Sequence, residues 1–165
     1  MEIIGDFNTT VTKALSEIYP DYEKLNALVI CGTHNPHDVE MMIDKIKEAR
    51  ELKRPFLGIC FGHQLAAIEY ARNVLGIKDA TSQEFYTPTM GSAPEFIVKE
   101  RNEGLKVGLH DGESWWNRYE VVEGFKDIWK KVDNFMTVQY HPEYQSSQDK
   151  PHPDLVKFLN LCKRQ

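Results

Sequence analysis

Short apolar runs alternate along the chain with longer stretches in which apolar residues recur every three or four positions. Such runs are typical of buried strands, and the longer spacing is typical of amphipathic helices. The runs predict strands over residues 2–5, 27–30, 56–59 and 135–140. The spacing predicts helices over residues 9–18, 39–49, 64–75 and 155–162. Because strands and helices alternate, we predict an α/β fold, a three-layer α/β/α sandwich with a mainly parallel central sheet.

The stretch over residues 77–116 follows neither pattern clearly. We expect short strands at 95–98 and 105–108, around the turn-forming sequence Asn102-Glu103-Gly104, and a further strand at 118–121. Asn8 or Thr9 is the expected N-cap of the first helix. No internal repeat or long linker interrupts the sequence, so we predict a single domain over residues 1–165.

Cys60 stands where the predicted strand at 56–59 meets the following helix, in the sequence Gly58-Ile59-Cys60-Phe61-Gly62. A nucleophile between two glycines in a sharp strand-to-helix turn forms a nucleophile elbow. The glycines leave room for the turn, and the start of the helix favours a thiolate. The backbone N–H of Phe61 would donate to a developing oxyanion. The alternative is that Cys60 is a small buried apolar residue between two packing glycines.

His141 and Glu143 follow the last predicted strand, in the sequence His141-Pro142-Glu143. The carboxyl ends of parallel strands meet at one edge of the sheet, so His141 should lie near Cys60. A thiol nucleophile needs such a base, and Glu143 is close enough to hold one tautomer of the imidazole. Taken alone, His-Pro-Glu also fits a loop histidine beside a solvated carboxylate. Together with the elbow, it predicts a catalytic triad of Cys60, His141 and Glu143.

The composition narrows the range of functions. The 165 residues carry a formal charge of −5, which argues against nucleic acid as a partner because phosphate binding usually needs a basic face. No apolar run reaches the roughly 18 residues of a membrane span, and the N-terminus does not resemble a signal peptide, so we expect no membrane partner and a cytoplasmic location. The three cysteines, Cys31, Cys60 and Cys162, suit neither a disulfide framework nor a zinc knot. We expect no cofactor, because no phosphate-binding loop is evident, and no metal, because His34 and His37 lack a third ligand.

The sequence Leu57-Gly58-Ile59-Cys60-Phe61-Gly62-His63-Gln64 resembles the active-site signature of the class I glutamine amidotransferases. Its continuation through residues 71–80 to Glu84 is similar to the glutaminase domain of CTP synthase in particular. Two later blocks, Arg118-Tyr119-Glu120-Val121 and residues 138–143, match in the same order. The resemblance implies a compact version of the class I glutamine amidotransferase fold and the hydrolysis of L-glutamine to glutamate and ammonia.

The resemblance also implies a role for each matched residue. Cys60 would attack the side-chain amide and form a γ-glutamyl thioester, while His141 carries the proton to ammonia and Glu143 orients His141. The implied partner is a synthetase subunit that receives the ammonia, because no synthetase domain is evident in the sequence. The implied substrate-binding residues are Gln64, which lines the pocket, Glu84, which pairs with the α-ammonium, and Arg118 and Tyr119, which recognise the α-carboxylate.

The sequence departs from the family in the loop after the second predicted strand. The family has Pro-Gly-Gly-Phe-Gly there, and one backbone N–H of that loop helps form the oxyanion hole, whereas this chain has Cys31-Gly32-Thr33-His34-Asn35. The resemblance therefore places Gly32 and Thr33 with Phe61 at the oxyanion hole. If the second position needs a positive φ, a β-branched threonine is costly there, and the hole would be weakened.

The sequence leaves three functions open. The first is a working glutaminase. The second is a catalytically weakened paralogue that serves as a glutamine-binding or protein-interaction module, which Thr33 and the shortened connections favour. The third is a hydrolase of another γ-glutamyl compound that uses the same cysteine and histidine. Trp115 and Trp116 fit a lid, a partner surface or simple packing equally well.

Overall fold

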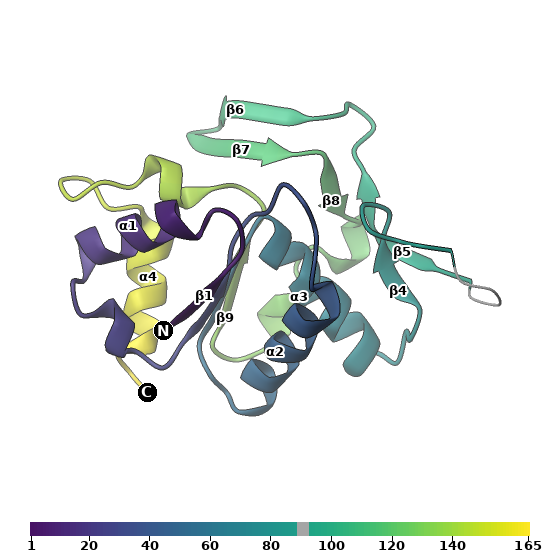
Figure 1. Cartoon of the computed structure of the whole chain (residues 1–165), viewed down its shortest axis with the longest axis horizontal. Coiled ribbons are helices and arrows are strands. Elements are labelled where there is room, and N and C mark those ends of the chain that lie inside the picture. The colour runs from purple at the N-terminus through teal and green to yellow at the C-terminus, as the bar shows by residue number, and fades with distance from the viewer. Residues whose placement is uncertain (89–92) are drawn as a thin grey trace.

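A parallel sheet of four strands forms the centre of the computed structural model, which describes residues 1–88 and 93–165 (Figure 1). Its strands lie in the order β1-β2-β3-β9 and all pair in parallel. Their bounds are Glu2–Ile4 for β1, Leu28–Ile30 for β2, Phe56–Ile59 for β3 and Phe135–Val138 for β9. These are the four strands predicted from the apolar runs, with ends that differ by at most two residues.

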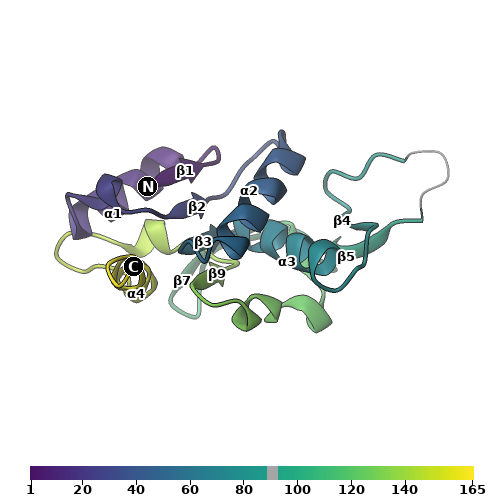
Figure 2. The same cartoon turned by 90° about the horizontal axis from the view of Figure 1, so that it is seen from below.

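Two helices cover each face of this sheet. Their bounds are Asn8–Ile18 for α1, Val39–Glu51 for α2, Phe61–Asn73 for α3 and Pro153–Cys162 for α4. In both views α1 and α4 lie on one side of the sheet, with α2 and α3 on the other (Figures 1 and 2). The predicted three-layer α/β/α sandwich with a parallel central sheet is confirmed.

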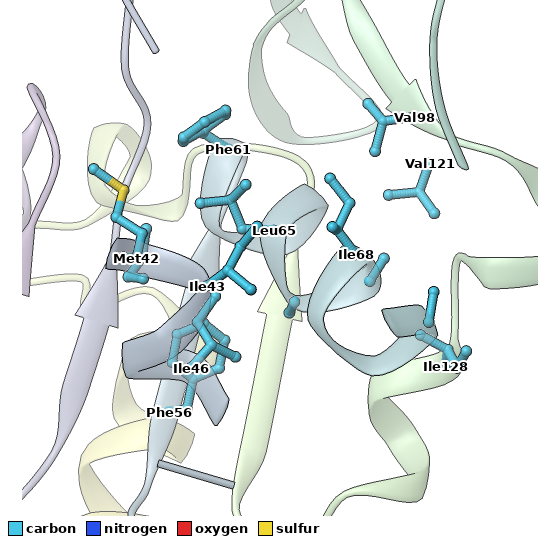
Figure 3. Close-up of a cluster of buried hydrophobic side chains, with 14 of the residues drawn as sticks. Met42, Ile43, Ile46, Phe56, Phe61, Leu65, Ile68, Val98, Val121 and Ile128 are labelled. Atoms are coloured by element: carbon cyan, nitrogen blue, oxygen red, sulfur yellow. The ribbon is translucent and has the colours of Figure 1, made fainter. Parts of the chain in front are cut away.

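The sheet separates two apolar clusters because successive strand residues face opposite sides. Phe56 faces α2 and α3 and packs with Ile46 and Leu65 in the cluster shown in Figure 3. Leu57, the next residue, faces the opposite side and packs with residues of α1 and α4, including Phe158. Both faces of β3 are thus buried, which fixes the position of the residue at its end.

A second, smaller layer of strands follows α3. A three-stranded sheet has the order β4-β5-β8, and a separate hairpin pairs β6 with β7 and projects from the body of the molecule (Figure 1). Their bounds are Ala80–Ser82 for β4, Glu95–Glu100 for β5, Lys106–His110 for β6, Glu113–Asn117 for β7 and Tyr119–Val121 for β8. The strands expected near 95–98 and 105–108 exist, but they do not pair with each other: β5 pairs with β4 and β8, and β6 pairs with β7.

The ends of several elements differ from the sequence-based expectation. The predicted N-cap at Asn8 or Thr9 is wrong, because α1 starts at Asn8 and Phe7 precedes it without a capping side chain. The Asn8 side chain instead donates to the carbonyl of Gly5 at 2.8 Å. In the part of the chain that the structure describes, four short 3-10 helices join the elements: η1 (Tyr22–Lys24), η2 (Glu123–Phe125), η3 (Ile128–Lys131) and η4 (Pro142–Gln145). Within the described ranges, no helix is both long and apolar enough to cross a bilayer.

Candidate active site

Cys60 occupies the turn between β3 and α3 in a strained backbone conformation. Its φ of 52° and ψ of −98° lie in a region that residues other than glycine rarely adopt. The turn is held from both sides, because the N–H of Cys60 donates to Val138 O at 2.8 Å and Cys60 O accepts from Gln64 N at 3.2 Å. This is the geometry of a nucleophile elbow, with the side chain at the carboxyl edge of the sheet.

Two glycines make the elbow possible. A Cβ at Gly58 would lie 2.7 Å from the carbonyl carbon of Gly62, inside the turn itself. A Cβ at Gly62 would lie 2.0 Å from Ile30 O on the neighbouring strand. Both contacts are with backbone atoms, so the prediction that side chains would crowd these positions is confirmed.

His141 and Glu143 form a buried pair at the end of β9. Nδ1 of His141 lies 2.7 Å from Oε1 of Glu143, and both side chains are almost fully enclosed. Nε2 of His141 is buried too, and it has no hydrogen-bond partner among residues 1–88 and 93–165. Gly32 packs against the imidazole, since a Cβ there would lie 2.8 Å from Cε1 of His141. The carboxylate therefore fixes the orientation of the imidazole ring, with Nε2 pointing away from Glu143.

The electrostatic surroundings favour the imidazolium form of His141. Burial alone would lower the pKa of His141, but its interactions with Cys60 and Glu143 outweigh burial and raise that pKa to about 10. A histidine held in this state can donate a proton to a leaving group at neutral pH.

Strand β7 supports both the cysteine and the histidine through its backbone. Ser114 O accepts the N–H of His141 at 2.7 Å, and Trp116 O accepts the Cys60 thiol at 3.5 Å. Nε2 of Gln139 lies 3.7 Å from the same sulfur. This role of β7 could not be predicted from the sequence, because a backbone carbonyl accepts hydrogen bonds whatever side chain its residue carries.

The two tryptophans of β7 differ in their surroundings. Trp115 packs beside Tyr140, with a ring-centroid distance of 5.7 Å, and Lys106 Nζ lies 3.4 Å from the centre of its indole. Trp116 is half exposed and lies edge-on to His34, at a ring-centroid distance of 5.9 Å. Trp115 is therefore a packing residue, and Trp116 forms part of the rim of the cavity described next.

A cavity of about 350 Å³ opens beside Cys60. Pockets of this size accept small metabolites. Six of the other residues predicted for the site line this cavity: Thr33, Phe61, Gln64, Glu84, Arg118 and Tyr119. The remaining lining residues are His34, Pro36, Leu105, Trp116 and Asn117. Gly32 does not line the cavity and instead packs behind it against His141.

The cavity carries one acidic and one basic side chain suited to a zwitterion. Glu84 is partly buried, and burial raises the pKa of its carboxyl to about 7. No ion pair to Glu84 is found within the described part of the chain. Arg118 is exposed at the mouth of the cavity, with its Nε 3.7 Å from Glu100 Oε1. An unpaired carboxylate and a loosely paired guanidinium can hold an amino group and a carboxylate apart.

The loop that departs from the family is unstrained. Neither Gly32 nor Thr33 has a positive φ, so the strain considered for a threonine at this position is absent. Asp6 holds the loop instead, by accepting hydrogen bonds from the Thr33 hydroxyl and from the N–H of His34 at 3.0 Å. The Thr33 hydroxyl is also the main cause of the lowered pKa of Asp6. On the other side of the cysteine, Phe61 opens α3, so its N–H has no acceptor within the helix.

Comparison with known proteins identifies the family. The family model of glutamine amidotransferase class-I matches residues 6–161. The chain belongs to the class I glutamine amidotransferases. The resemblance stated from the elbow and the two later blocks is thereby confirmed.

Curated relatives of this amidotransferase chain include CTP synthases. The CTP synthase of Methanoculleus marisnigri is 32% identical, over 87% of this chain and 35% of the relative. That of Encephalitozoon cuniculi is 31% identical, over 93% of this chain and 37% of the relative. The chain thus spans about a third of the length of these relatives.

A solved structure supports the fold of the amidotransferase chain. The glutaminase domain of Trypanosoma brucei CTPS with bound acivicin superimposes with a TM-score of 0.74. The match covers 100% of this chain and 95% of that domain, at 18% sequence identity. At this identity the likeness establishes the shared fold, in agreement with the compact class I fold expected from the sequence.

Proposed function

We propose that this chain is a glutaminase, which hydrolyses L-glutamine to glutamate and ammonia with Cys60 as nucleophile. The observation that carries the proposal is that Cys60, in a strained elbow, opens on the same cavity as Glu84 and Arg118. The buried pair of His141 and Glu143 supplies the base and its orienting carboxylate. The family membership of the chain agrees with this chemistry.

In the first half of the reaction, the sulfur of Cys60 attacks the side-chain carbonyl carbon of glutamine. The thiol proton passes to Nε2 of His141 before the attack, which gives the imidazolium that the surroundings favour. The negative charge on the carbonyl oxygen is stabilised by the backbone N–H groups of Phe61 and Thr33. Collapse of this intermediate breaks the carbon–nitrogen bond. The imidazolium of His141 protonates the departing nitrogen, which leaves as ammonia, and a γ-glutamyl thioester remains on Cys60.

In the second half, water cleaves the thioester. Neutral His141 takes a proton from the attacking water, and the same N–H groups stabilise the second oxyanion. The thiol leaves with that proton and glutamate is released. Glu143 keeps Nδ1 of His141 protonated throughout, so that Nε2 performs each transfer.

The ammonia is the product with a further use. The curated relatives are named CTP synthases and are about three times as long as the part that this chain matches. We infer that a synthetase consumes the ammonia made here. Because uncontrolled release of ammonia is wasteful, we expect slow turnover by the isolated chain and faster turnover when the synthetase is added.

The direct test is glutamate release from L-glutamine by the purified chain, with and without a candidate synthetase. The weakened-paralogue alternative predicts glutamine binding by calorimetry with no glutamate release in either condition. The γ-glutamyl hydrolase alternative predicts faster cleavage of another γ-glutamyl compound in competition with glutamine. The absence of positive φ at Thr33 removes one reason to favour the paralogue.

Glutamine binding should depend on the ionisation of Glu84. Burial raises the pKa of Glu84 to about 7, so its carboxylate, which attracts the substrate ammonium, is lost as the pH falls below 7. We expect the Kd for L-glutamine, measured by calorimetry on Cys60→Ala, to fall about tenfold between about pH 6 and pH 8. Glu84→Gln should bind weakly at every pH, while Glu123→Gln, at an exposed residue paired with Lys126, should keep the profile. An unchanged pH profile in Glu84→Gln would exclude this role.

A further inference from the structure

The β6–β7 hairpin is a separate two-stranded sheet that nevertheless contributes to the candidate active site. Within the described part of the chain it pairs with neither of the other sheets, and β6 is mostly exposed. An isolated hairpin of this kind is only marginally stable in water. Yet the carbonyl of Ser114 accepts the N–H of His141 at 2.7 Å, and the carbonyl of Trp116 accepts the Cys60 thiol. Contacts outside the hairpin must therefore hold β7 in place.

Glu113, the first residue of β7, makes such a contact. Its Oε2 lies 2.9 Å from Nε2 of His152, the residue that precedes α4. The side chain of His152 is only 8% exposed, so water competes little for this bond. In Figure 1 β7 lies above the yellow-green segment through η4 that leads to α4, and β7 and η4 are in contact. A second bond, from Gln145 Nε2 to the Ser114 hydroxyl at 2.7 Å, lies at the surface.

The hydrogen bonds of His152 assign the positions of its protons. Nδ1 of His152 accepts the N–H of Asp154 at 3.2 Å and thereby caps α4. A ring nitrogen that accepts from a backbone N–H carries no proton, so the proton of the imidazole is on Nε2, which donates it to Glu113. One imidazole thus caps α4 with one nitrogen and ties β7 to α4 with the other.

The segment that leads to His141 lies between β7 and the start of α4. Tyr140, the preceding residue, packs against Trp115 of β7 at a ring-centroid distance of 5.7 Å and against His152 at 6.2 Å. Its hydroxyl donates to Oδ2 of Asp154. Because His141 is bonded to β7 on one side and follows a residue packed on α4, a shift of β7 relative to α4 would displace it.

We propose that Glu113 is a positioning residue for the candidate active site. Its bond to His152 keeps β7 where the carbonyls of Ser114 and Trp116 meet His141 and Cys60. Glu113 does not line the cavity beside Cys60, so it acts through these carbonyls and not on the substrate. The inference rests on the proposed glutaminase function and adds to it a residue that lies outside all of the matched motifs.

Three variants separate the bond from the other roles of its two residues. Glu113→Ala removes the acceptor, whereas Glu113→Gln keeps an oxygen that accepts from His152. His152→Asn keeps a side chain that caps α4 but is too short to reach Glu113. We expect Glu113→Ala and His152→Asn each to lower kcat for glutamate release about tenfold, and Glu113→Gln to retain at least about half of the rate. KM should change less than about twofold, because Glu84 and Arg118 lie outside β7.

The double variant tests whether both residues act through the same bond. Glu113→Ala combined with His152→Asn should be no slower than either single variant. Glu123→Ala, at an exposed residue paired with Lys126, is the control and should leave kcat unchanged. An unchanged kcat in Glu113→Ala, or losses that multiply in the double variant, would overturn the proposal.

Amide hydrogen exchange, followed by NMR, tests the positioning directly and does not require turnover. The N–H of His141, which donates to Ser114 O, should exchange about tenfold faster in Glu113→Ala and at the normal rate in Glu113→Gln. The N–H of Cys60, which donates to Val138 O instead, should be unaffected. Unchanged exchange at His141, or equally faster exchange at both amides, would contradict the positioning role. An unmodified chain that releases no glutamate even with a synthetase would instead count against the proposed function, and the exchange rates would still decide the role of Glu113.

Discussion

Replacing Cys60 with alanine is expected to lower the rate of glutamate release at least about 10,000-fold, to a level near the detection limit. The sulfur forms the bond to the substrate in the proposed mechanism, and nothing else in the elbow can replace it. The fold should survive, because alanine is smaller than cysteine and has the same backbone requirements. The measurement is kcat from glutamate release, with circular dichroism to establish that the variant is folded.

Cys162→Ala is the matched control for Cys60→Ala. Cys162 is also buried, but it lies at the end of α4 and does not line the cavity. This variant should keep the rate of the unmodified chain within about twofold. A Cys60→Ala enzyme that retains more than about 1% of the rate would show that another group performs the attack.

Replacing Gly62 with alanine is expected to reduce the free energy of unfolding by about 3 kcal/mol. The new Cβ would lie 2.0 Å from Ile30 O, a backbone atom of β2, and it would be carried by the backbone of the first turn of α3. Neither side can yield without displacing β2 or the elbow, so activity should fall together with stability. Urea unfolding followed by circular dichroism measures the change.

Gly124→Ala controls for the general effect of adding a methyl group to a glycine. A Cβ at Gly124 meets no atom within 4 Å, and the residue lies in η2, away from the site. Its free energy of unfolding should change by less than about 0.5 kcal/mol. If Gly62→Ala unfolded at the same urea concentration as Gly124→Ala, the close packing of α3 against β2 would be contradicted.

The central sheet was predictable from the sequence because its strands are buried on both faces. Every residue of β2 and β3 is buried, and each strand is a continuous apolar run. The two runs are followed by chemically distinctive residues, Cys31 and Cys60. The smaller layer was less predictable, because β4 has only three residues, and because β6 and β7 form a hairpin in which β6 is mostly exposed. A short strand with one exposed face has too few residues for an apolar run or an alternating pattern to be recognised in the sequence.

The candidate active site could likewise be predicted only in part. The residues expected around the cysteine lie in two compact motifs, so the sequence itself indicated that Cys60, His141 and Glu143 would meet at one edge of the sheet. The contribution of β7 could not be read, because it consists of the carbonyls of Ser114 and Trp116. Asn117 was missed for a related reason. An isolated asparagine is common, and nothing in the sequence places this one in the wall of the cavity.

The loop at Thr33 shows how a family pattern can mislead. The glycine at the aligned position suggested a positive φ, but the backbone of this chain follows a path that a β-branched residue can adopt. Asp6 supplies the hydrogen bonds that stabilise the loop. The substitution is therefore compatible with an ordered loop beside the nucleophile.

The central claim is that Cys60 is a nucleophile in a cavity shaped for glutamine. It is tested most directly by incubating the chain with the diazoketone analogue of L-glutamine and locating any adduct by mass spectrometry of peptides. This measurement does not depend on an activating partner, because alkylation needs only the bound analogue and the reactive sulfur. We predict one adduct, on Cys60, whose formation slows when excess L-glutamine is present. No adduct, or an adduct on Cys31 or Cys162 that glutamine does not prevent, would contradict the claim.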